Sequence, residues 1–181
     1  MLPVDDLTTL ALAAGNGDRA ALEQFIRRAQ PDVWRLCANL GRGGDTDDLT
    51  QETFIRAMRS LPSFRADSSA RTWILTIARR VCADHVRSAQ RQRRLIDRLA
   101  QTAEQTSVVS DGTSTTDALT MLSALGEEQR VAMVLTQVLG LSYAEAGEVC
   151  GCPVGTIRSR VARAREALTE GADSQRTVAD G

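Results

Sequence analysis

The residues best suited to chemistry in this chain are arginines, and they are grouped. All 22 basic residues are Arg; residues 155–165 hold four of them and no acid, and residues 71–98 hold eight with two acids. A guanidinium forms paired hydrogen bonds with guanine edges and with phosphates, so both stretches predict contacts to nucleic acid. A solvated helix face is the alternative for each stretch.

The composition excludes several classes of catalysis. The chain has no Lys and a single His, His85, so a Schiff-base lysine, a P-loop lysine and a pair of imidazoles are all impossible. Cys82, His85, Cys150 and Cys152 could be imagined around zinc, but C-x-C is not the usual zinc spacing and small thiols commonly pack inside helical proteins. We expect no enzymatic activity, metal or cofactor.

The net charge of -1 hides three segments of different sign. Residues 1–100 hold 16 Arg and 12 acids, and residues 101–130 hold one Arg and five acids. Residues 102–116 contain eight Ser or Thr in fifteen positions without helical periodicity, which predicts a flexible linker. The expected organisation is a domain over 1–100, an acidic linker over 101–117, a second domain over 118–170 and a disordered tail over 171–181.

Helical periodicity is strong on both sides of this linker. Apolar residues recur at the i, i+3, i+4, i+7 spacing in residues 33–40, 54–61, 70–82 and 131–138. Alternating strand patterns with hairpin turns do not occur. The pattern predicts an all-α protein, with a bundle of about four N-terminal helices and a smaller C-terminal group.

The C-terminal domain carries the signals of a helix-turn-helix. Ser142 and Glu145 form the pattern of a capping box, and Gly151 can supply the left-handed residue that ends a short helix. Pro153 suits the first turn of a second helix, which is expected to continue to about Thr169. Helices joined this tightly cross steeply, and Gly147 would allow their close approach.

The second of these helices has two faces. Val154, Ile157, Val161, Ala164 and Leu168 fall on one side, while Ser159, Ala162, Arg163 and Glu166 fall on the other with Arg158 and Arg160 beside them. Small residues and arginines on an exposed face fit a DNA major groove.

For residues 64–69 and residues 45–48, the sequence pattern does not decide between a functional and a purely structural role. Residues 64–69 form a short loop before a basic helix, so they could hold an unstacked base while arginines bind phosphates. Trp73 in that helix is as readily a core residue. The acids of residues 45–48 favour a helix start, and a capped surface helix explains them.

Targeting signals are missing from the sequence. No run approaches the roughly 18 apolar residues of a membrane-spanning helix, and Asp5 and Asp6 stand where a signal peptide would be basic. A cytoplasmic protein without membrane contact is expected.

Three blocks resemble the extracytoplasmic-function (ECF) family of bacterial RNA polymerase sigma factors. They are DDLTQETFIRAM (47–58), FRADSSARTWILTIARRVCADHVR (64–87) and GLSYAEAGEVCGCPVGTIRSRVARAREAL (140–168), and the third is most similar to the sigma-C type. The resemblance implies a factor that binds the polymerase core at the β′ clamp coiled coil and the β flap, binds promoter DNA and helps to open it. It implies an anti-sigma factor as a possible further partner.

The resemblance also implies roles for individual residues. Core docking would involve Asp48, Leu49, Gln51, Glu52, Phe54, Ile55 and Arg56. The minus-ten element would be bound by Phe64, Arg65, Asp67 and Ser68 of a base-capturing loop and by Arg71, Arg79, Arg80, Asp84 and Arg87. The minus-thirty-five element would be read by Arg158, Ser159, Ala162 and Arg163, with Arg160 and Arg165 on phosphates. The acidic linker would thread through the polymerase toward its RNA exit channel.

The sequence departs from the family pattern at two places. Arg80 stands where Asn is common, and Ala146-Gly147 replaces the usual Ile-Ala, which predicts a smaller and weaker C-terminal core. Two other functions remain alternatives: a stand-alone helix-turn-helix repressor, and a DNA-processing enzyme targeted by this domain. The repressor leaves residues 48–56 unexplained, and the enzyme lacks clustered metal-binding carboxylates or a nucleophile with its base.

Overall fold

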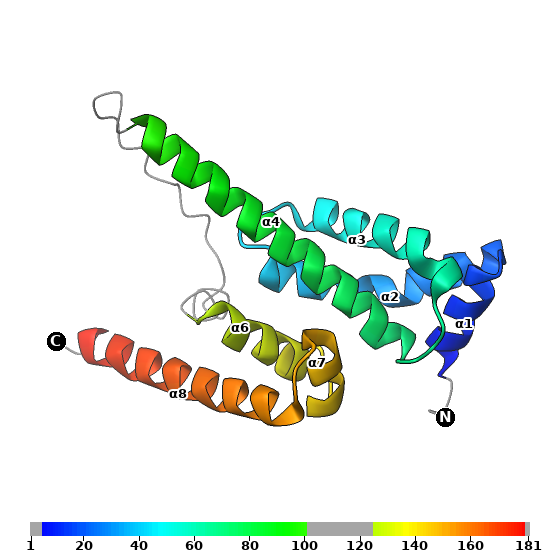
Figure 1. Ribbon diagram of the computed structural model, residues 1–181. Helices are drawn as coiled ribbons and strands as arrows, with labels where there is room; N and C mark the ends of the chain where they lie inside the picture. The colour runs from blue at the N-terminus through cyan, green and yellow to red at the C-terminus, as the bar shows by residue number, and fades with distance from the viewer. Residues whose placement is uncertain (1–4, 101–124, 180–181) are drawn as a thin grey trace.

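The computed structural model describes the backbone of residues 5–100 and 125–179 and the side chains of residues 5–97 and 125–170 (Figure 1). Within these ranges every regular element is a helix, which confirms the all-α prediction. The linker expected over 101–117 lies outside the described residues.

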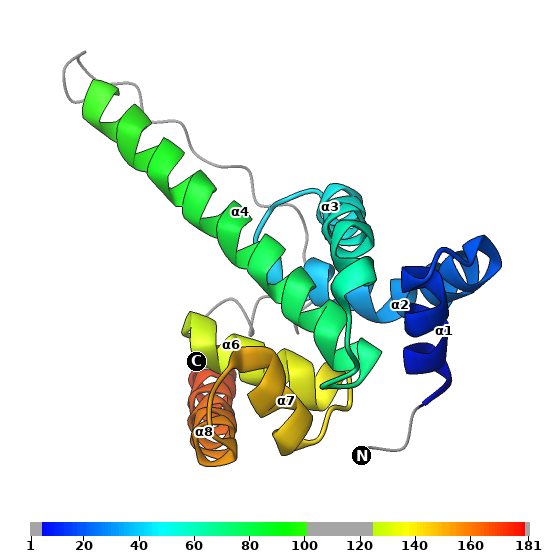
Figure 2. The same ribbon diagram turned by 45° about the vertical axis from the view of Figure 1, so that its right-hand side comes forward.

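The N-terminal half is a bundle of four helices and one short 3₁₀ turn. They are α1 (Asp6–Gly15), α2 (Arg19–Leu40), α3 (Thr46–Ser60), η1 (Leu61–Ser63) and α4 (Ala70–Ala100). Asp5, Asp18 and Asp45 cap the first three helices by accepting hydrogen bonds from first-turn amides. Helix α4 packs on α2 and α3, and its C-terminal part extends well beyond the bundle (Figures 1 and 2).

The C-terminal half consists of α6 (Glu127–Met133), the π-helical turn η2 (Val134–Val138), α7 (Tyr143–Cys150) and α8 (Val154–Ala179). Ser142 and Glu145 form the expected capping box, and Gly151 has the left-handed φ of 66° that ends α7. A Cβ on Gly147 would lie 2.9 Å from the carbonyl oxygen of Cys152. The close approach of the two helices therefore depends on Gly147.

Helix α8 differs from the sequence-based prediction at both ends. Pro153 precedes the helix, and its carbonyl accepts from the amides of Thr156 and Ile157; Val154, expected in the buried stripe, is 41% exposed because it lies at the helix start. The helix continues to Ala179, where a tail without structure was expected from residue 171. No proline interrupts residues 171–179, so the helical hydrogen bonds can continue.

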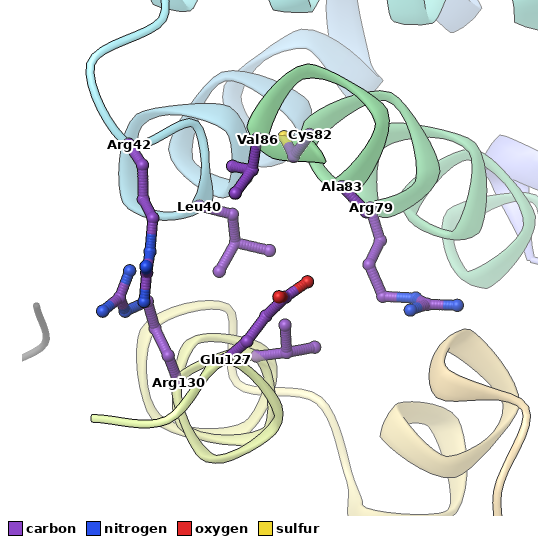
Figure 3. A pocket seen from close by; sticks show the side chains of 9 residues that line it. Leu40, Arg42, Arg79, Cys82, Ala83, Val86, Glu127 and Arg130 are labelled. Atoms are coloured by element: carbon purple, nitrogen blue, oxygen red, sulfur yellow. The ribbon is translucent and has the colours of Figure 1, made fainter. Parts of the chain in front are cut away.

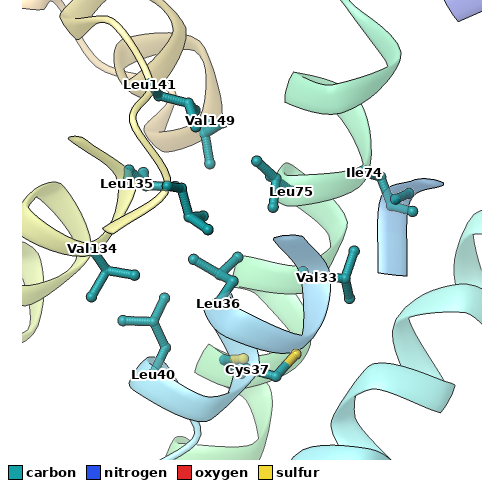
Figure 4. Close-up of a cluster of buried hydrophobic side chains, with 14 of the residues drawn as sticks. Val33, Leu36, Cys37, Leu40, Ile74, Leu75, Val134, Leu135, Leu141 and Val149 are labelled. Carbon is teal, nitrogen blue, oxygen red and sulfur yellow. The ribbon is translucent and has the colours of Figure 1, made fainter. Parts of the chain in front are cut away.

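One hydrophobic core joins the two halves. Leu36 on α2 and Leu75 on α4 point into the same cluster as Leu135 on η2 and Val149 on α7 (Figure 4). Each of these four side chains is at most 1% exposed. The C-terminal half thus buries apolar surface against the N-terminal bundle, which offsets its own small core.

Candidate functional site

The loop expected to capture a base lies between η1 and α4 and is anchored by an aromatic contact. The ring centroids of Phe64 and Trp73 are 4.9 Å apart, and those of Phe25 and Trp73 are 6.3 Å apart. Arg65 and Asp67 are exposed, whereas Ser68 is half-buried. Trp73 packs against the core, so in this loop it is the support of Phe64 and not a free stacking surface.

The backbone of this loop is held in an unusual conformation. Ala66 has a φ of 57°, in the left-handed region that residues with a Cβ rarely adopt. The Ser69 hydroxyl oxygen accepts from the amide of Thr72, and the amide of Ala70 donates to the Thr8 hydroxyl of α1 at 2.9 Å. These hydrogen bonds fix the end of the loop where it enters α4.

Two arginines predicted to bind DNA contact the C-terminal half in this structure. Arg71 pairs with Asp32 at 2.7 Å, and its Nη2 donates to the Leu139 carbonyl at 2.7 Å. Arg79 donates from Nε to the Val149 carbonyl at 3.0 Å. These guanidiniums join the halves, because packing places carbonyl groups of η2 and α7 beside α4. The contacts of Arg71 and Arg79 with DNA stay a prediction.

Four charged residues predicted for two different partners meet in one network between α3 and α4. Arg56 donates to Glu52 at 2.7 Å and to Asp84 at 3.0 Å, and Arg87 donates to Asp84 at 2.6 Å. Hydrogen bonds from Arg56 and then Arg87 lower the pKa of Asp84, and those to Glu52 and Asp84 raise the pKa of Arg56. Glu52 and Arg56, predicted to dock on the polymerase, are thus electrostatically coupled to Asp84 and Arg87, predicted to bind the minus-ten element.

This network predicts a pH dependence of stability. The pKa of Asp84 is lower in the folded than in the unfolded state, so its pairs stabilise the fold above the ordinary carboxyl pKa of about 3.9 and are lost as the pH falls through the folded value. Because these groups are about half exposed, each pair should contribute below about 1 kcal/mol. In Asp84→Asn, the free energy of unfolding should decrease less than in the wild type as the pH is lowered. Asp97→Asn, which changes an exposed residue of the same helix, should show the same pH dependence as the wild type.

The predicted docking helix α3 presents only part of its expected set. Asp48 and Gln51 are exposed, and Glu52, Ile55 and Arg56 are half-buried. Leu49 and Phe54 are 6% and 7% exposed and belong to the core. They lie on the apolar stripe of α3, beneath its exposed face, and their part in docking stays a prediction.

Trp34, which no sequence motif singled out, lies beside this face. Its ring is 45% exposed, and Nε1 donates to Asp47 at the start of α3 at 3.0 Å. Its exposure could have been predicted from the sequence. Trp34 follows Val33 and so lies outside the apolar stripe of Val33, Leu36 and Leu40, on a side of the helix that faces solvent.

The second helix of the helix-turn-helix presents the expected outward face. Arg158, Ser159, Ala162 and Arg163 are exposed, while Ile157 and Val161 are 0% and 1% exposed beneath them. Within the described side chains, no ion pair engages Arg158 or Arg163. This face offers two guanidiniums and small residues to a ligand.

Two arginines predicted for phosphates have other partners in this arrangement. Arg160 is half-buried, pairs with Glu128 of α6 at 2.7 Å and donates to the Cys152 sulfur at 3.6 Å. It holds α8 on α6 in this structure, and its assignment as a DNA contact stays a prediction. Arg165 is exposed but donates to the Gln137 side chain at 3.2 Å.

The four cysteines do not assemble with His85. Cys37 and Cys82 lie in the N-terminal core, where their mutual hydrogen bond and then burial raise the pKa of Cys82. Cys150 and Cys152 flank the turn between α7 and α8, and burial raises the pKa of Cys150 to about 11. In the described part of the chain, no three His, Cys, Asp or Glu side chains are grouped to hold a metal ion.

A small cavity lies where α4 faces α6. Its walls are Leu40, Arg42, Arg79, Cys82, Ala83, Val86, Glu127, Arg130 and Val131 (Figure 3). The space for water-sized molecules is about 20 Å³, which is room for about one water. Burial and the Arg42 charge lower the pKa of Arg130, which Glu127 partly opposes. This cavity is far smaller than the roughly 300 Å³ of a typical small-molecule site.

Among the described helices, none combines the length and apolar character needed to cross a membrane.

Comparison with known families gives two matches that together cover both halves. Residues 25–92 match Sigma-70 region 2, and residues 116–168 match Sigma-70, region 4. The ECF RNA polymerase sigma factor SigC of Mycobacterium tuberculosis is 51% identical over 178 residues, covering 92% of this chain and 91% of the relative. The ECF RNA polymerase sigma-E factor of Escherichia coli K12 is 34% identical over 165 residues, covering 84% and 86%.

Solved structures show the same architecture. CnrH, solved with the cytosolic domain of CnrY, is 27% identical with a TM-score of 0.70, and the match covers 92% of this chain and 96% of CnrH. RpoE of Bartonella quintana, solved with the anti-sigma factor NepR, is 29% identical with a TM-score of 0.63, covering 82% and 94%.

Proposed function

Because the chain belongs to the extracytoplasmic-function family of bacterial RNA polymerase sigma factors, we propose that its halves bind the two promoter elements separately. It is a sigma factor that directs promoter-specific transcription. The chain itself catalyses no reaction, and it acts in the cytoplasm with the polymerase.

The upstream element is read by α8. The observation that carries this assignment is the exposed face of Arg158, Ser159, Ala162 and Arg163 on the second helix of a helix-turn-helix. Arginines there can bind guanine O6 and N7, and Ala162 and Ser159 leave room for close approach to the groove floor.

The downstream element is bound by the N-terminal half. Arg65 and Asp67 project from the anchored loop, and Arg80 is exposed on α4. The polar face of α3, with Asp48, Gln51 and the partly exposed Glu52, faces the polymerase clamp. The contacts of Arg71 and Arg79 with the C-terminal half have to break before these two arginines can reach DNA.

Joining two weak DNA-binding halves through one polymerase raises their effective concentration, so neither half needs high affinity alone. The related CnrH and RpoE were solved with a partner protein. A protein partner of the anti-sigma class fits this chain as well.

The decisive experiment combines the purified chain with core polymerase and promoter DNA. We expect the chain to co-elute with the core during gel filtration and to produce a promoter-dependent transcript. A stand-alone repressor would instead bind duplex DNA tightly without core, and failure to co-elute would contradict the sigma assignment.

Arg163→Ala tests the upstream assignment. Loss of a bidentate base contact should cost about 1–3 kcal/mol, which weakens selection of the correct upstream base by about fivefold to more than a hundredfold. The measurement is competition between promoters that differ only in the upstream element.

Arg27→Ala serves as the control, because Arg27 is an exposed arginine of α2 whose partner is Glu23. It should leave promoter choice unchanged. Core binding should stay normal in both variants, and an equal loss of core binding by Arg163→Ala would contradict its role.

A further inference from the structure

Two thiols meet at the turn of the helix-turn-helix. Cys150 is the last residue of α7, and Cys152 follows it after a single glycine, Gly151. The two cysteine side chains are hydrogen-bonded to each other, and both residues are half-buried, so solvent reaches part of each. The proposed contacts with DNA and polymerase use neither thiol. We refer to Cys150 and Cys152 as the turn thiols.

The backbone of the turn brings these thiols together. The amide of Cys152 donates to the carbonyl of Gly147 at 3.0 Å, and the amide of Gly151 donates to the carbonyl of Glu148 at 3.1 Å. With the left-handed φ of 66° at Gly151, these two bonds form a Schellman motif, which reverses the chain at the end of a helix. The contact between the thiols is therefore built into the local fold of the turn.

The surroundings of the two sulfurs differ. Arg160 of α8 donates from Nη1 to Cys152 Sγ at 3.6 Å. Burial raises the pKa of Cys150 to about 11, although the charges of Arg79 and Arg160 oppose this rise. The thiolate is the form of cysteine that attacks an oxidant, and a neighbouring arginine favours it. Cys152 is therefore the first thiol to react, while Cys150 stays protonated beside it.

We propose that the turn thiols are a peroxide-responsive pair, and that their oxidation to a disulfide weakens reading of the upstream promoter element. The effect on promoter reading rests on the proposed function. Disulfides in cytosolic proteins are commonly transient and serve to sense oxidants, and a half-buried pair in contact suits that use better than a structural one.

The oxidation takes two steps. The Cys152 thiolate attacks one oxygen of hydrogen peroxide, and the O–O bond breaks to give a sulfenic acid and hydroxide, which takes up the proton that Cys152 had released. The sulfur of Cys150 then attacks Cys152 Sγ, the S–O bond breaks, and the oxygen leaves as water with the Cys150 proton. One peroxide is thus reduced to two waters while two thiols are oxidised to one disulfide.

A disulfide changes this turn because the turn is tightly packed. Bonded sulfurs lie about 2.05 Å apart, much closer than sulfurs in hydrogen-bond contact. A Cβ on Gly147 would lie 2.9 Å from the Cys152 carbonyl oxygen, so the turn leaves little free space for Cys152 to move. Its displacement would shift the start of α8 relative to α7 and take the sulfur away from Arg160. Arg158 and Arg163, which read the upstream element in the proposed function, lie on α8.

The other two cysteines provide an internal control. Cys37 and Cys82 are also hydrogen-bonded to each other, but they are 1% and 2% exposed in the N-terminal core. Oxidation of a cysteine depends on its exposure as well as on its thiolate character. Mild peroxide should therefore leave this buried pair reduced.

The first test is chemical and uses the purified full chain without polymerase. After treatment with hydrogen peroxide, the remaining thiols are alkylated and the protein is cut with trypsin after arginine. Both turn thiols then lie in one peptide, residues 131–158, whereas Cys37 and Cys82 lie in residues 36–42 and 81–87. We expect peptide 131–158 to lose two hydrogen atoms and to resist alkylation until dithiothreitol is added. The other two peptides should be alkylated as in the untreated protein.

Single substitutions separate the roles of the two thiols. In Cys150→Ser, the sulfenic acid of Cys152 has no thiol to react with and should be trapped by dimedone. In Cys152→Ser, little dimedone should be trapped, because Cys150 stays protonated near neutral pH. No disulfide in the wild type, equal oxidation of Cys37 and Cys82, or equal trapping in the two variants would overturn the proposal.

The second test measures promoter choice by the assembled holoenzyme, with promoters that differ only in the upstream element. The chain is oxidised and freed of peroxide before it is mixed with core. Selection of the correct upstream element should fall by about fivefold or more, which corresponds to the loss of about one base contact, and dithiothreitol should restore it. Cys152→Ser treated in the same way is the matched control and should select as its untreated sample does.

The reduced protein separates this proposal from the proposed function. If reduced wild type fails to join the core or to initiate transcription, the proposed function is wrong whatever its thiols do. If reduced wild type succeeds but the disulfide leaves promoter selection unchanged, or if Cys152→Ser loses as much as the wild type, only the role of the turn thiols is wrong.

Discussion

Leu135→Asp should separate the two halves of the protein. Leu135 is 0% exposed and points from η2 into the cluster that contains Leu36 and Leu75. An unpaired carboxylate at this position loses several kcal/mol of hydration without gaining a partner. The population with joined halves should fall by more than about a hundredfold, because each 1.4 kcal/mol is a factor of ten.

The separation is measured by small-angle X-ray scattering, as a larger radius of gyration than that of the wild type. Far-UV circular dichroism should remain close to the wild type, because both halves keep their helices. Val138→Asp is the matched control: it introduces the same charge into the same turn at a side chain that is 42% exposed. An unchanged radius, or loss of helical signal, would show that Leu135 does not act at the contact between the halves.

Opening also has a consequence for the arginines at this contact. Arg71 and Arg79 would lose their acceptors at Leu139 and Val149. The Nε–H of Arg79, which donates to the Val149 carbonyl, should then exchange hydrogen faster in Leu135→Asp than in Val138→Asp. This measurement tests whether the Arg79 guanidinium is released together with the apolar contact.

Phe25→Ala should cause the largest loss of stability within the N-terminal bundle. Phe25 is 0% exposed and its ring lies 6.3 Å from that of Trp73, which in turn contacts Phe64. Replacing a buried Phe with Ala costs about 3–5 kcal/mol, through lost transfer energy and the cavity that remains. That is a large part of the 5–15 kcal/mol that stabilises a typical domain.

Urea unfolding followed by circular dichroism gives the measurement. With a slope of about 1–3 kcal/mol per molar urea, the midpoint should fall by about 1–5 M. The neighbouring exposed residue provides the control, since Gln24→Ala should stay within about 0.5 kcal/mol of the wild type. If Phe25→Ala lowers the free energy of unfolding by no more than Gln24→Ala does, the aromatic cluster does not dominate the stability of the N-terminal bundle.

Elements set by short-range physics were predictable from the sequence. Helices follow from apolar residues spaced by one turn, and the capping box of Ser142 with Glu145 and the left-handed Gly151 need only neighbouring residues. The outward face of α8 was predicted for the same reason, because its register follows from the buried Ile157 and Val161. The end of α8 was placed too early, since no strong stop signal such as proline exists beyond Thr169.

Family resemblance identified the regions of the site but not the orientation of each residue. Leu49 and Phe54 match the docking block, yet they are in the core, because a motif includes the residues that support a surface as well as those that form it. Their place on the apolar stripe of α3 already pointed inward. Trp34 lies outside the quoted blocks and was found only from its exposure and its bond to Asp47.

The amino-acid sequence alone thus determined the helices, the helix-turn-helix and the two groups of arginines. The partners of those arginines depended on tertiary packing: Arg71 bonds to a carbonyl 68 residues away, and Arg160 pairs with Glu128 on another helix. A guanidinium on a long flexible side chain can reach many acceptors. Which acceptor it finds depends on helices brought together by the shared hydrophobic core, and no local pattern contains that information.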